Sequence, residues 1–560
     1  MNAENYSRDF LGSLEAEYIL NNVVLLAINA KYVHSSLSVW VIAGGISRYA
    51  QLPHNINIVE ATINQPVLEI VEAVAEFMPE IIGVSTYIWN AGKLPGLLSL
   101  LRTRLPDAVF VLGGPEASNN VDFWLKNGAD HVLCGEGEYT FPEFLNTRIP
   151  GDFKNSDTKV SACIESEQLS PVYENPVDPY TGEYLNTLSG RLVYIEASRG
   201  CPYMCSFCLS AGSGVRFFPL DAVKNQIYTL SRSGIKTLKF VDRTFNCNAE
   251  RAFELFKYVI GLDTNCCFHF EAAADLFDDL MLSLLKTAPP GRIQFEIGLQ
   301  SFFEPALNAS CRHMDIIKAE SNIRSLVDMK NIHLHVDLIA GLPYETLDDF
   351  MDSFDRAYFL NTHTLQLGFL KLLHGSKLRE QAESLGIQYS RDPPYEITSS
   401  PWLSPEDLQI LIHTENALRH TRNKGRFIST IEYVLSVSGM RPFTLMASLG
   451  TAVPNHGVQL EEYVISVYRH FASLPFVDMD ILQDRLVFDW LGMVKGKNKP
   501  AVLKNTFTRC GDIQKAADKI IGHKLRREEH AVLRSGKNIF VDRNDYDPVT
   551  GLYRVHTYDC

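Results

Sequence analysis

The chain has 560 residues, 46% hydrophobic and 21% charged, which is the composition of an ordinary globular protein with room for roughly three to four domains. Its net charge of −14 argues against a globally basic nucleic-acid binder, and its 11 cysteines, an odd count in a long chain, are not the pattern of a small disulfide scaffold. The first twenty residues hold acidic side chains and no long apolar core, and later apolar runs are short, so we expect no signal peptide, no membrane partner and a reducing, cytoplasmic location.

Residues 22–147 alternate short apolar runs with helical patterns, which predicts a doubly wound (Rossmann-like) parallel sheet. The predicted strands are 23–28, 56–59, 81–85, 108–114 and 131–134. The predicted helices are 66–78 and 93–105. Ligands bind such sheets beyond the carboxyl ends of the strands. No Gly-x-Gly-x-x-Gly follows the first strand, so these loops do not predict a dinucleotide site.

Residues 148–189 are polar and rich in turn residues, which predicts a linker between domains. Residues 190–378 then repeat strand and helix about six times. The predicted strands there are 192–196, 237–241, 267–271, 293–297, 334–339 and 365–369. Residues 379–560 are harder to interpret; helical patterns at 405–422 and 460–473 predict a mostly helical C-terminal domain of unassigned function. The basic run 524–534 is interpreted as a solvated helix.

The most specific motif follows the strand 192–196. Cys201, Cys205 and Cys208 have the spacing C-x₃-C-x₂-C. Three thiolates on one loop can hold three irons of a 4Fe-4S cluster and leave the fourth iron open for chemistry. A structural zinc site would need a fourth Cys or His at a suitable offset, and a bacterial ferredoxin would carry a further Cys followed by Pro; neither is present nearby.

This loop resembles that of the radical S-adenosylmethionine (SAM) enzymes, whose signature C-x₃-C-x-φ-C has an aromatic residue at φ, here Phe207. The resemblance implies that SAM chelates the open iron and is cleaved to a 5′-deoxyadenosyl radical. It also implies a partial (β/α)₆ barrel over residues 190–378, with reactive groups at the carboxyl ends of its strands, and an external electron donor of the flavodoxin or ferredoxin type.

The same resemblance implies roles for individual side chains. Phe207 would pack near the SAM adenine, and Asp242 would pair with the SAM ammonium. Arg243 departs from the acidic residue often found beside that position and could bind a carboxylate instead. Glu271, at the end of the next strand, could accept hydrogen bonds from the SAM ribose.

Later strand ends carry two further family-like segments. Gln300 and Ser301 close the segment 296–301 and are expected at the barrel rim. Gly341 lies in the segment 337–343, whose backbone would contact adenine. The remaining cysteines of this region are irregularly spaced, which favours buried free thiols over a second cluster; they are Cys247, Cys266, Cys267 and Cys311.

The N-terminal sheet resembles the cobalamin-binding domain that precedes the barrel in one large branch of radical SAM enzymes. The resemblance rests on the turns Gly-Gly-Pro-Glu at 113–116 and Gly-Glu-Gly-Glu at 135–138, where glycines let the backbone approach a flat macrocycle. The Asp-x-His-x-x-Gly motif that supplies a cobalt-ligating His elsewhere is absent. The candidate cobalamin-binding residues are Tyr32, Ser85, Gly113, Gly114 and Glu136.

Together these features predict an α/β protein with four parts: a cobalamin-binding domain at 1–147, a linker at 148–189, a radical SAM barrel at 190–378 and a C-terminal domain at 379–560. The predicted activity is methylation of an unactivated carbon in a small-molecule or peptide substrate. Three alternatives remain: a radical cyclisation or rearrangement without methyl transfer, a non-catalytic redox or sensor protein, and an RNA methylthio-transferase. The last would need a second cluster and a basic RNA-binding module, neither of which the sequence offers.

Overall fold

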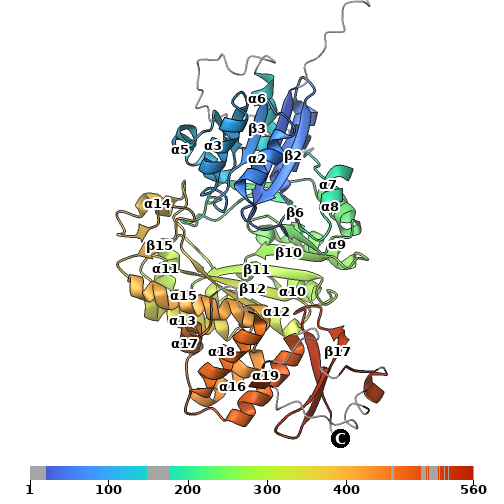
Figure 1. Cartoon of the computed structure of the whole chain (residues 1–560), viewed down its shortest axis with the longest axis vertical. Helices are drawn as coiled ribbons and strands as arrows, with labels where there is room; N and C mark the ends of the chain where they lie inside the picture. Colours follow the sequence, from blue (N-terminus) through green and yellow to red (C-terminus); the bar gives the residue numbers. More distant parts are fainter. Residues whose placement is uncertain are drawn as a thin grey trace, which may run out of the picture. The chain divides into compact units, whose positions relative to one another are not determined.

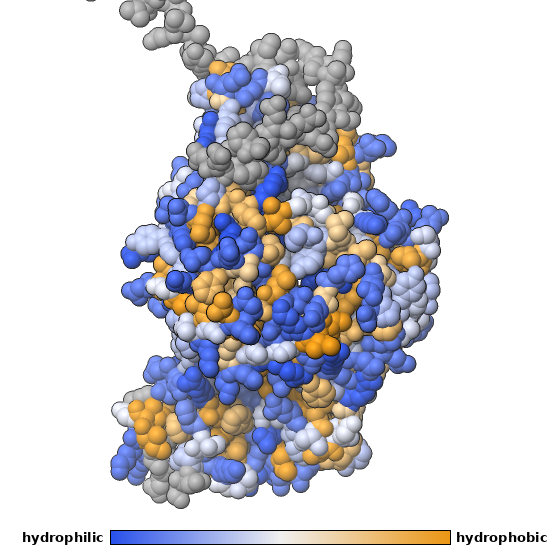
Figure 2. All heavy atoms as spheres, turned by 180° about the vertical axis from the view of Figure 1, so that it is seen from behind, coloured by the Kyte–Doolittle hydropathy of each residue, from blue (hydrophilic) through white to orange (hydrophobic). Residues whose placement is uncertain are grey.

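The computed structural model describes residues 21–147, 176–455, 459–493 and 529–558, with 500, 502, 503, 515, 518–522 and 524–526. The chain divides into two compact units (Figure 1). The first contains Met1–Ile195, Asp221–Lys236 and Asp392–Pro394. The second contains Glu196–Leu220, Thr237–Arg391 and Tyr395–Cys560. Of the described helices, none has both the length and the hydrophobicity that a membrane crossing requires. On the face in Figure 2, hydrophobic and hydrophilic residues are interspersed.

The first unit is built on a parallel sheet with the order β2-β1-β3-β4-β5. All five predicted strands are confirmed: β1 (Asn22–Asn29), β2 (Asn55–Thr62), β3 (Ile81–Ser85), β4 (Val109–Gly113) and β5 (His131–Leu133). The helices between and after them are α1 (Leu37–Tyr49), α2 (Val67–Ala75), α3 (Leu94–Arg104), α4 (Pro115–Ser118), α5 (Val121–Lys126) and α6 (Gly137–Asn146). The inner strands are apolar throughout because helices cover both faces of such a sheet.

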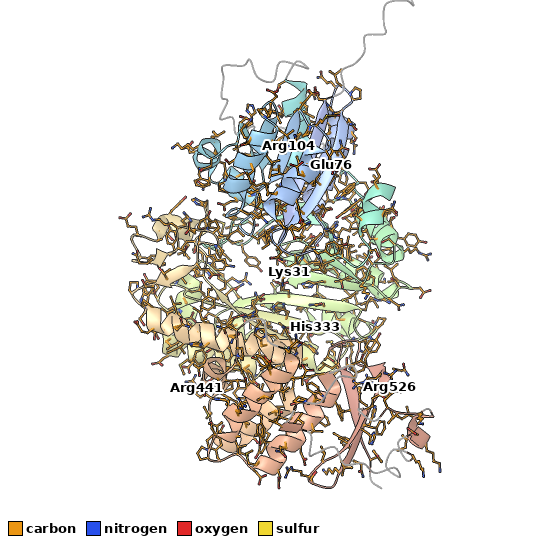
Figure 3. All side chains as sticks on the ribbon, in the orientation of Figure 1. Lys31, Glu76, Arg104, His333, Arg441 and Arg526 are labelled. Atoms are coloured by element: carbon orange, nitrogen blue, oxygen red, sulfur yellow. The ribbon has the colours of Figure 1, made fainter. Side chains whose placement is uncertain are left out.

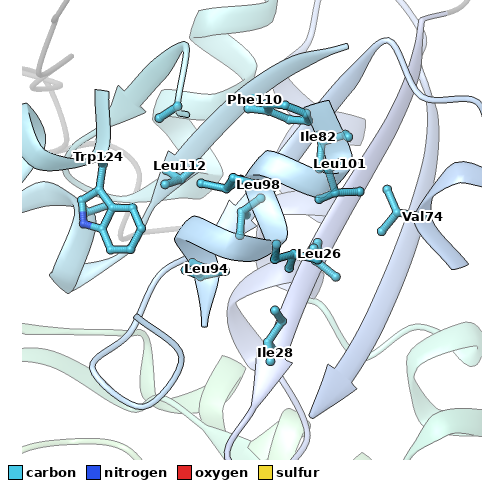
Figure 4. Close-up of a cluster of buried hydrophobic side chains, with 14 of the residues drawn as sticks. Leu26, Ile28, Val74, Ile82, Leu94, Leu98, Leu101, Phe110, Leu112 and Trp124 are labelled. Atoms are coloured by element: carbon cyan, nitrogen blue, oxygen red, sulfur yellow. The ribbon is translucent and has the colours of Figure 1, made fainter. Parts of the chain in front are cut away.

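One face of this sheet packs against α2, α3 and α5 (Figure 4). Leu26 and Ile82 from the strands meet Leu98 and Leu101 of α3, and all four are fully buried. Trp124 of α5 completes the cluster with no exposed surface. The other face holds a second cluster, in which Leu25 and Val111 pack with Phe141 of α6. The sheet is therefore a rigid base for the loops that leave its carboxyl ends.

The contact between α1 and α6 depends on Gly45. A Cβ atom at this position would collide with the backbone of Glu138 at the start of α6. We expect Gly45→Ala to lower the free energy of unfolding by about 1–3 kcal/mol or more, because a backbone cannot give way as a side chain can. Chemical denaturation followed by circular dichroism measures the change.

Gly96→Ala is the matched control for that experiment. Gly96 also lies inside a helix, α3, but a Cβ there would meet nothing within 4 Å. Since alanine is the better helix former, this variant should be up to about 1 kcal/mol more stable than the parent. Equal effects of the two substitutions would show that the α1–α6 contact is not tightly packed.

The expected linker at 148–189 is described only from residue 176, and residues 148–175 lie outside the described part. From there the chain forms a short helix, α7 (Gly182–Thr187), before β6 (Leu192–Ile195). Tyr184 of α7 is fully buried and donates a hydrogen bond to Ser35. The end of the expected linker is thus packed structure belonging to the first unit.

The second unit contains the predicted barrel strands in the parallel order β13-β12-β11-β10-β9. These strands are β9 (Thr237–Phe240), β10 (Cys267–Ala272), β11 (Ile293–Gln300), β12 (His333–Ala340) and β13 (Thr364–Phe369). Buried and half-buried residues alternate along β11 and β12, so the strands present one apolar face and one polar face. The helices of this region are α8 (Leu220–Arg232, most of which belongs to the first unit), α9 (Ala249–Gly261), α10 (Asp279–Leu285), α11 (Glu304–Ala309), α12 (Ile316–Met329), α13 (Leu347–Tyr358) and α14 (Lys377–Gln381), with 3₁₀ turns η2 (Phe245–Cys247) and η3 (Ala274–Leu276).

The C-terminal part begins with the two-stranded sheet β14 (Gln388–Tyr389) and β15 (Ile397–Ser399) and continues into helices. The helices are α15 (Pro405–His420), η4 (Arg422–Lys424), α16 (Ile428–Ser438), α17 (Pro442–Ala452), α18 (Leu460–Ala472) and α19 (Met479–Met493). The structure adds an antiparallel sheet that the sequence did not predict, made of β16 (His530–Val532), β17 (Asn538–Tyr546) and β18 (Tyr553–Tyr558). Buried Asp489 of α19 ties the helices together by accepting hydrogen bonds from the backbone amides of Ser429 and Thr430.

Candidate functional site

The three-cysteine loop is closed by a hairpin of two short strands, β7 (Ser198–Cys201) and β8 (Gly214–Phe217). The strands pair antiparallel, with Cys201 opposite Gly214. Gly200 has a φ of +96°, and a Cβ there would collide with the carbonyl of Gly214, so only glycine fits. The hairpin therefore holds the segment from Cys201 to Ser213 as one compact loop.

The three thiols of this loop are free, with Cys201 and Cys205 buried and Cys208 half-buried. The loop is fastened at its middle, because Ser206 donates its backbone N–H to the Ser310 carbonyl at 2.9 Å and accepts one from Leu378 at 2.8 Å. In the described part of the chain, only Glu296, His335 and Asp337 bring metal-capable atoms within 4.8 Å of one another. Three free thiols on one loop are the donor set of an iron–sulfur cluster with one open iron.

Asp242 lies at the base of the hairpin. Its carboxylate accepts hydrogen bonds from the Ala197 N–H at 2.9 Å and from the Ser198 hydroxyl at 2.5 Å. Burial raises the pKa of Asp242 to about 7, although the two hydrogen bonds act in the opposite direction. Both carboxylate oxygens therefore hold the start of β7. The expected contact of Asp242 with a SAM ammonium stays a prediction.

Arg312 is a site residue that sequence reasoning missed. Its guanidinium donates to the Gly298 carbonyl at 2.8 Å, lies 4.0 Å from the Cys205 sulfur and stacks over the Tyr203 ring at 5.3 Å. Burial raises the pKa of the Cys205 thiol, and the Arg312 guanidinium acts against this rise in favour of the thiolate, the form that binds metal. No sequence signal pointed to Arg312, because 107 residues separate it from Cys205.

The polar face of the barrel strands carries an ion network. Lys239 of β9 lies 2.7 Å from Glu296 of β11 and 3.4 Å from Glu271 of β10. His269 hydrogen-bonds the same oxygen of Glu296 at 2.9 Å. On β12, His335 lies 3.0 Å from Asp337. Lys239 and His269 already pair with Glu296, and His335 already pairs with Asp337. We therefore interpret Glu296, His335 and Asp337 as members of an ion-pair network and assign no metal to them.

The network shifts its members in opposite directions. Burial would raise the pKa of Glu296, but hydrogen bonds from His269 and Lys239 outweigh it and hold that pKa well below its ordinary value. Burial dominates at Glu271 and raises its pKa despite Lys239 and Arg243. Burial likewise lowers the pKa of His333, on β12 and labelled in Figure 3, to about 3, so this imidazole is neutral.

These opposite shifts predict opposite pH dependences for two matched variants. Glu296 has a depressed pKa, so its contribution to stability is fully present above about pH 4.5 and is lost as the pH falls below that value. Glu296→Gln should cost about 2–4 kcal/mol at pH 7 by breaking a mostly buried pair, and its difference from the parent should shrink below pH 4.5. Denaturant titrations from pH 3.5 to 8 measure both effects.

Glu271→Gln is the control. Since the pKa of Glu271 is raised, the folded chain holds that proton more tightly than the unfolded chain, and the parent loses stability as pH rises. The cost of Glu271→Gln should therefore fall with rising pH. Parallel pH profiles for the two variants would contradict the described network.

The other predicted residues of the barrel occupy its rim. Gln300 has a φ of +71° and follows a register shift in β11. Ser301 is fully buried and donates to Glu345 at 2.5 Å, so it holds the loop after β12. Gly341 has a φ of +97° and directly follows β12. Phe207 is half-buried within the cysteine loop. Their roles toward SAM stay predictions.

In the first unit, most of the predicted cobalamin residues lie in loops at or near the carboxyl ends of the strands. Tyr32 is 75% exposed, and Gly114 has a φ of +101° with its Cα packed against the Thr86 backbone. The Ser85 hydroxyl donates to the Leu26 carbonyl at 3.4 Å. Gly113 accepts the Thr86 N–H at 2.7 Å, and Glu136 precedes α6. The structure thus brings Ser85, Gly113 and Gly114 together, and their ligand stays a prediction.

Sequence reasoning also missed Glu60, at which several loops of the first unit converge. Its carboxylate accepts hydrogen bonds from the Asn29 amide at 3.0 Å and the Trp40 indole at 3.1 Å, and it pairs with Arg191 at 2.5 Å. The Ser36 N–H is a fourth donor to this carboxylate. Four partners on one half-buried carboxylate fix the loop after β1. The only sequence signal is that Glu60 is the one charged residue of β2.

Three family models match the chain: residues 23–145 match the B12 binding domain, residues 195–357 the Radical SAM superfamily and residues 383–534 a protein family of unknown function, DUF4080. The chain is 25% identical over 358 residues to the cobalamin-dependent radical SAM methyltransferase TokK of Streptomyces tokunonensis, covering 58% of this chain and 51% of that protein. It is 24% identical over 306 residues to the 2-(S-pantetheinyl)-carbapenam-3-carboxylate methyltransferase of Streptantibioticus cattleyicolor, covering 49% and 44%. The chain thus spans about half the length of these curated relatives.

Two solved structures share the fold. The cobalamin-dependent SAM radical enzyme OxsB has a TM-score of 0.56 at 14% identity, over 84% of this chain and 79% of that one. The radical SAM methyltransferase TsrM from Kitasatospora setae, solved with cobalamin and a [4Fe-4S] cluster bound, has a TM-score of 0.53 at 17% identity, over 70% and 81%. At these identities the likeness establishes the architecture alone.

Proposed function

Because the chain joins a B12-binding domain to a radical SAM domain and is homologous to cobalamin-dependent radical SAM methyltransferases, we propose that it cleaves SAM at a 4Fe-4S cluster and methylates an unactivated carbon. The observation that carries this proposal is the loop of three free thiols closed by β7 and β8. When bound, the cluster supplies the electron that cleaves SAM, and cobalamin supplies the methyl group.

The chain's own residues hold and shape the site. Cys201, Cys205 and Cys208 are the proposed cluster ligands, and Asp242 fixes the strand that carries the first of them. Arg312 offers a fixed positive charge next to Cys205, and its remaining donors suit the carboxylate of SAM. Fixed charges and dipoles of this kind need no rearrangement during the reaction.

We assign the domains as 1–147, 148–189, 190–378 and 379–560, and the three family matches fall inside the first, third and fourth of these ranges. Tyr32, Ser85, Gly113, Gly114 and Glu136 are the proposed cobalamin-side residues. The proposed partners are a small-molecule or peptide substrate and an external one-electron donor of the flavodoxin or ferredoxin type. The substrate contacts are not assigned to residues.

The test is the cobalamin content of the chain purified without oxygen from cells supplied with cobalamin, followed by methyl transfer from labelled SAM. We expect about one cobalamin per chain, as one such domain would hold, and label in the product. An intact cluster without cobalamin would overturn the methyl-transfer assignment. Cobalamin and 5′-deoxyadenosine without label in any product would instead indicate a rearrangement.

A further inference from the structure

The end of α15 carries an unusual concentration of positive charge. Five of the eight residues from Arg419 to Arg426 are basic: Arg419, His420, Arg422, Lys424 and Arg426. The segment spans the end of α15 and the turn η4, and it stops just before α16. Basic residues in a last turn complement the helix dipole, which accounts for Arg419 and His420. It does not account for the charges beyond the helix.

One of those charges has a structural role. Arg422 is buried, its guanidinium stacks over the Tyr358 ring at 4.1 Å, and it donates to the Thr362 carbonyl at 3.1 Å. Asn423 beside it bonds both backbone groups of Leu365, near the start of β13. This fastens the segment to the amino ends of the barrel strands, whereas Gly341 and the hairpin-anchoring Asp242 follow the carboxyl ends of theirs.

Arg426 has no such role. It is half-buried, and burial lowers its pKa, yet no described residue accepts a hydrogen bond from its guanidinium or forms an ion pair with it. Arg419 pairs with Glu415 at 2.8 Å and donates to the Asn416 side-chain oxygen at 3.5 Å, so part of its donor set is already used. A guanidinium that loses water on folding without gaining an acceptor is costly unless a ligand supplies one.

Tyr463 of α18 lies within electrostatic reach of Arg419 and Arg426. It is 4% exposed, and its hydroxyl is buried without a hydrogen-bond partner among the described residues. Burial raises the pKa of Tyr463, and Arg426 and Arg419 are the charges that act against this rise. The His420 ring borders it, with centroids 5.5 Å apart. A buried phenol donor left open beside two cations is an arrangement for binding an anion.

We propose that Arg419, Arg426 and Tyr463, bordered by His420, form a binding site for a phosphate group of a small molecule. Two guanidinium groups and a hydroxyl supply several donors for a tetrahedral oxyanion with three or more acceptor oxygens. The site lies on the C-terminal helices near the amino ends of the barrel strands, so it is distinct from the cysteine loop. It goes beyond the proposed function and does not depend on it.

The test is a titration of the full chain with inorganic phosphate, measured by isothermal titration calorimetry. We expect saturable binding by the parent, and Arg426→Met, which keeps the apolar stem, should weaken it by about tenfold or more because a charge-assisted pair is lost. Tyr463→Phe should weaken it by about threefold to tenfold. Arg469→Gln is the matched control, since Arg469 is exposed on the same helix, and it should bind phosphate as the parent does.

A readout besides affinity separates binding from folding. Without phosphate, Tyr463→Phe should melt at or above the parent temperature, because it removes an unsatisfied buried hydroxyl; phosphate should raise the melting temperature of the parent more than that of Arg426→Met. No saturable binding by the parent, or equal binding by Arg426→Met, would overturn the proposal. Acetate that binds as tightly as phosphate would overturn the assignment of phosphate. Binding should survive Cys205→Ala, so failure here and failure of the proposed chemistry are distinguishable.

Discussion

Cys205→Ala should abolish reductive cleavage of SAM while leaving the fold intact. Cys205 is buried in the middle of the hairpin-closed loop, beside the Arg312 guanidinium at 4.0 Å. A cluster held by two thiolates instead of three loses a ligand to an iron that the protein must fix. We expect production of 5′-deoxyadenosine under reductant to fall to background, with the iron content of the anaerobically purified chain reduced.

The control is Cys267→Ala. Cys267 is also a free thiol in the same unit; it is half-buried and lies at the start of β10, away from the loop. This variant should keep its iron content and its SAM cleavage, because its thiol has no part in the proposed ligand set. Retained 5′-deoxyadenosine production by Cys205→Ala would contradict the cluster assignment, and equal loss in both variants would point to a general effect on folding.

Asp242→Ala should be the most damaging substitution outside the cysteines. It leaves the Ala197 N–H and the Ser198 hydroxyl buried without their acceptor. Each unsatisfied group costs about 1–3 kcal/mol, so the free energy of unfolding should fall by about 2–6 kcal/mol. A displaced β7 would also misplace Cys201, and SAM cleavage should fall on the order of 100-fold. Denaturant unfolding and 5′-deoxyadenosine production measure the two effects.

Asp242→Asn separates the hydrogen bonds from the charge. The amide keeps an acceptor for Ala197 and places its NH₂ group against the Ser198 oxygen, so the fold should be retained. The pKa of Asp242 is raised to about 7, so the folded chain binds this proton more tightly than the unfolded chain does. The parent should therefore lose stability relative to Asn as pH rises from about 4 to 7. If Asn is as damaging as Ala, the carboxylate itself is needed, as a SAM-ammonium partner would be.

Most of the architecture could be predicted because the strands are short apolar segments with clear boundaries. The inner strands β1, β3 and β4 of the first unit have nearly continuous apolar sequences, since helices cover both faces of that sheet. The barrel strands were equally clear, and Pro405 and Leu460 open helices at the predicted places. The C-terminal antiparallel sheet was missed because charged residues interrupt its strands, as Asp542, Arg543 and Asp545 do in β17.

The candidate site was less predictable because its contacts join distant positions. Cysteine spacing identified the loop, but β7 and β8 are only four residues each and β7 has no apolar alternation, so the hairpin was not predicted. The pairing of Lys239 with Glu296 depends on the register of three strands. Strand-end reasoning located Asp242 correctly but not the direction of its side chain, which turns toward Ala197 and Ser198.

The division of the chain has a consequence for how the molecule can be cut. The chain passes from one unit to the other after residues 195, 220, 236, 391 and 394, so neither unit is a single stretch of sequence. A gene fragment ending at Ile195 would omit Asp221–Lys236 from the first unit, and with it the buried side chains of Val223, Ile227 and Leu230. Because the two units are interleaved along the sequence, no single continuous gene segment encodes either unit alone. A protease that cuts one connection would therefore not separate the two units.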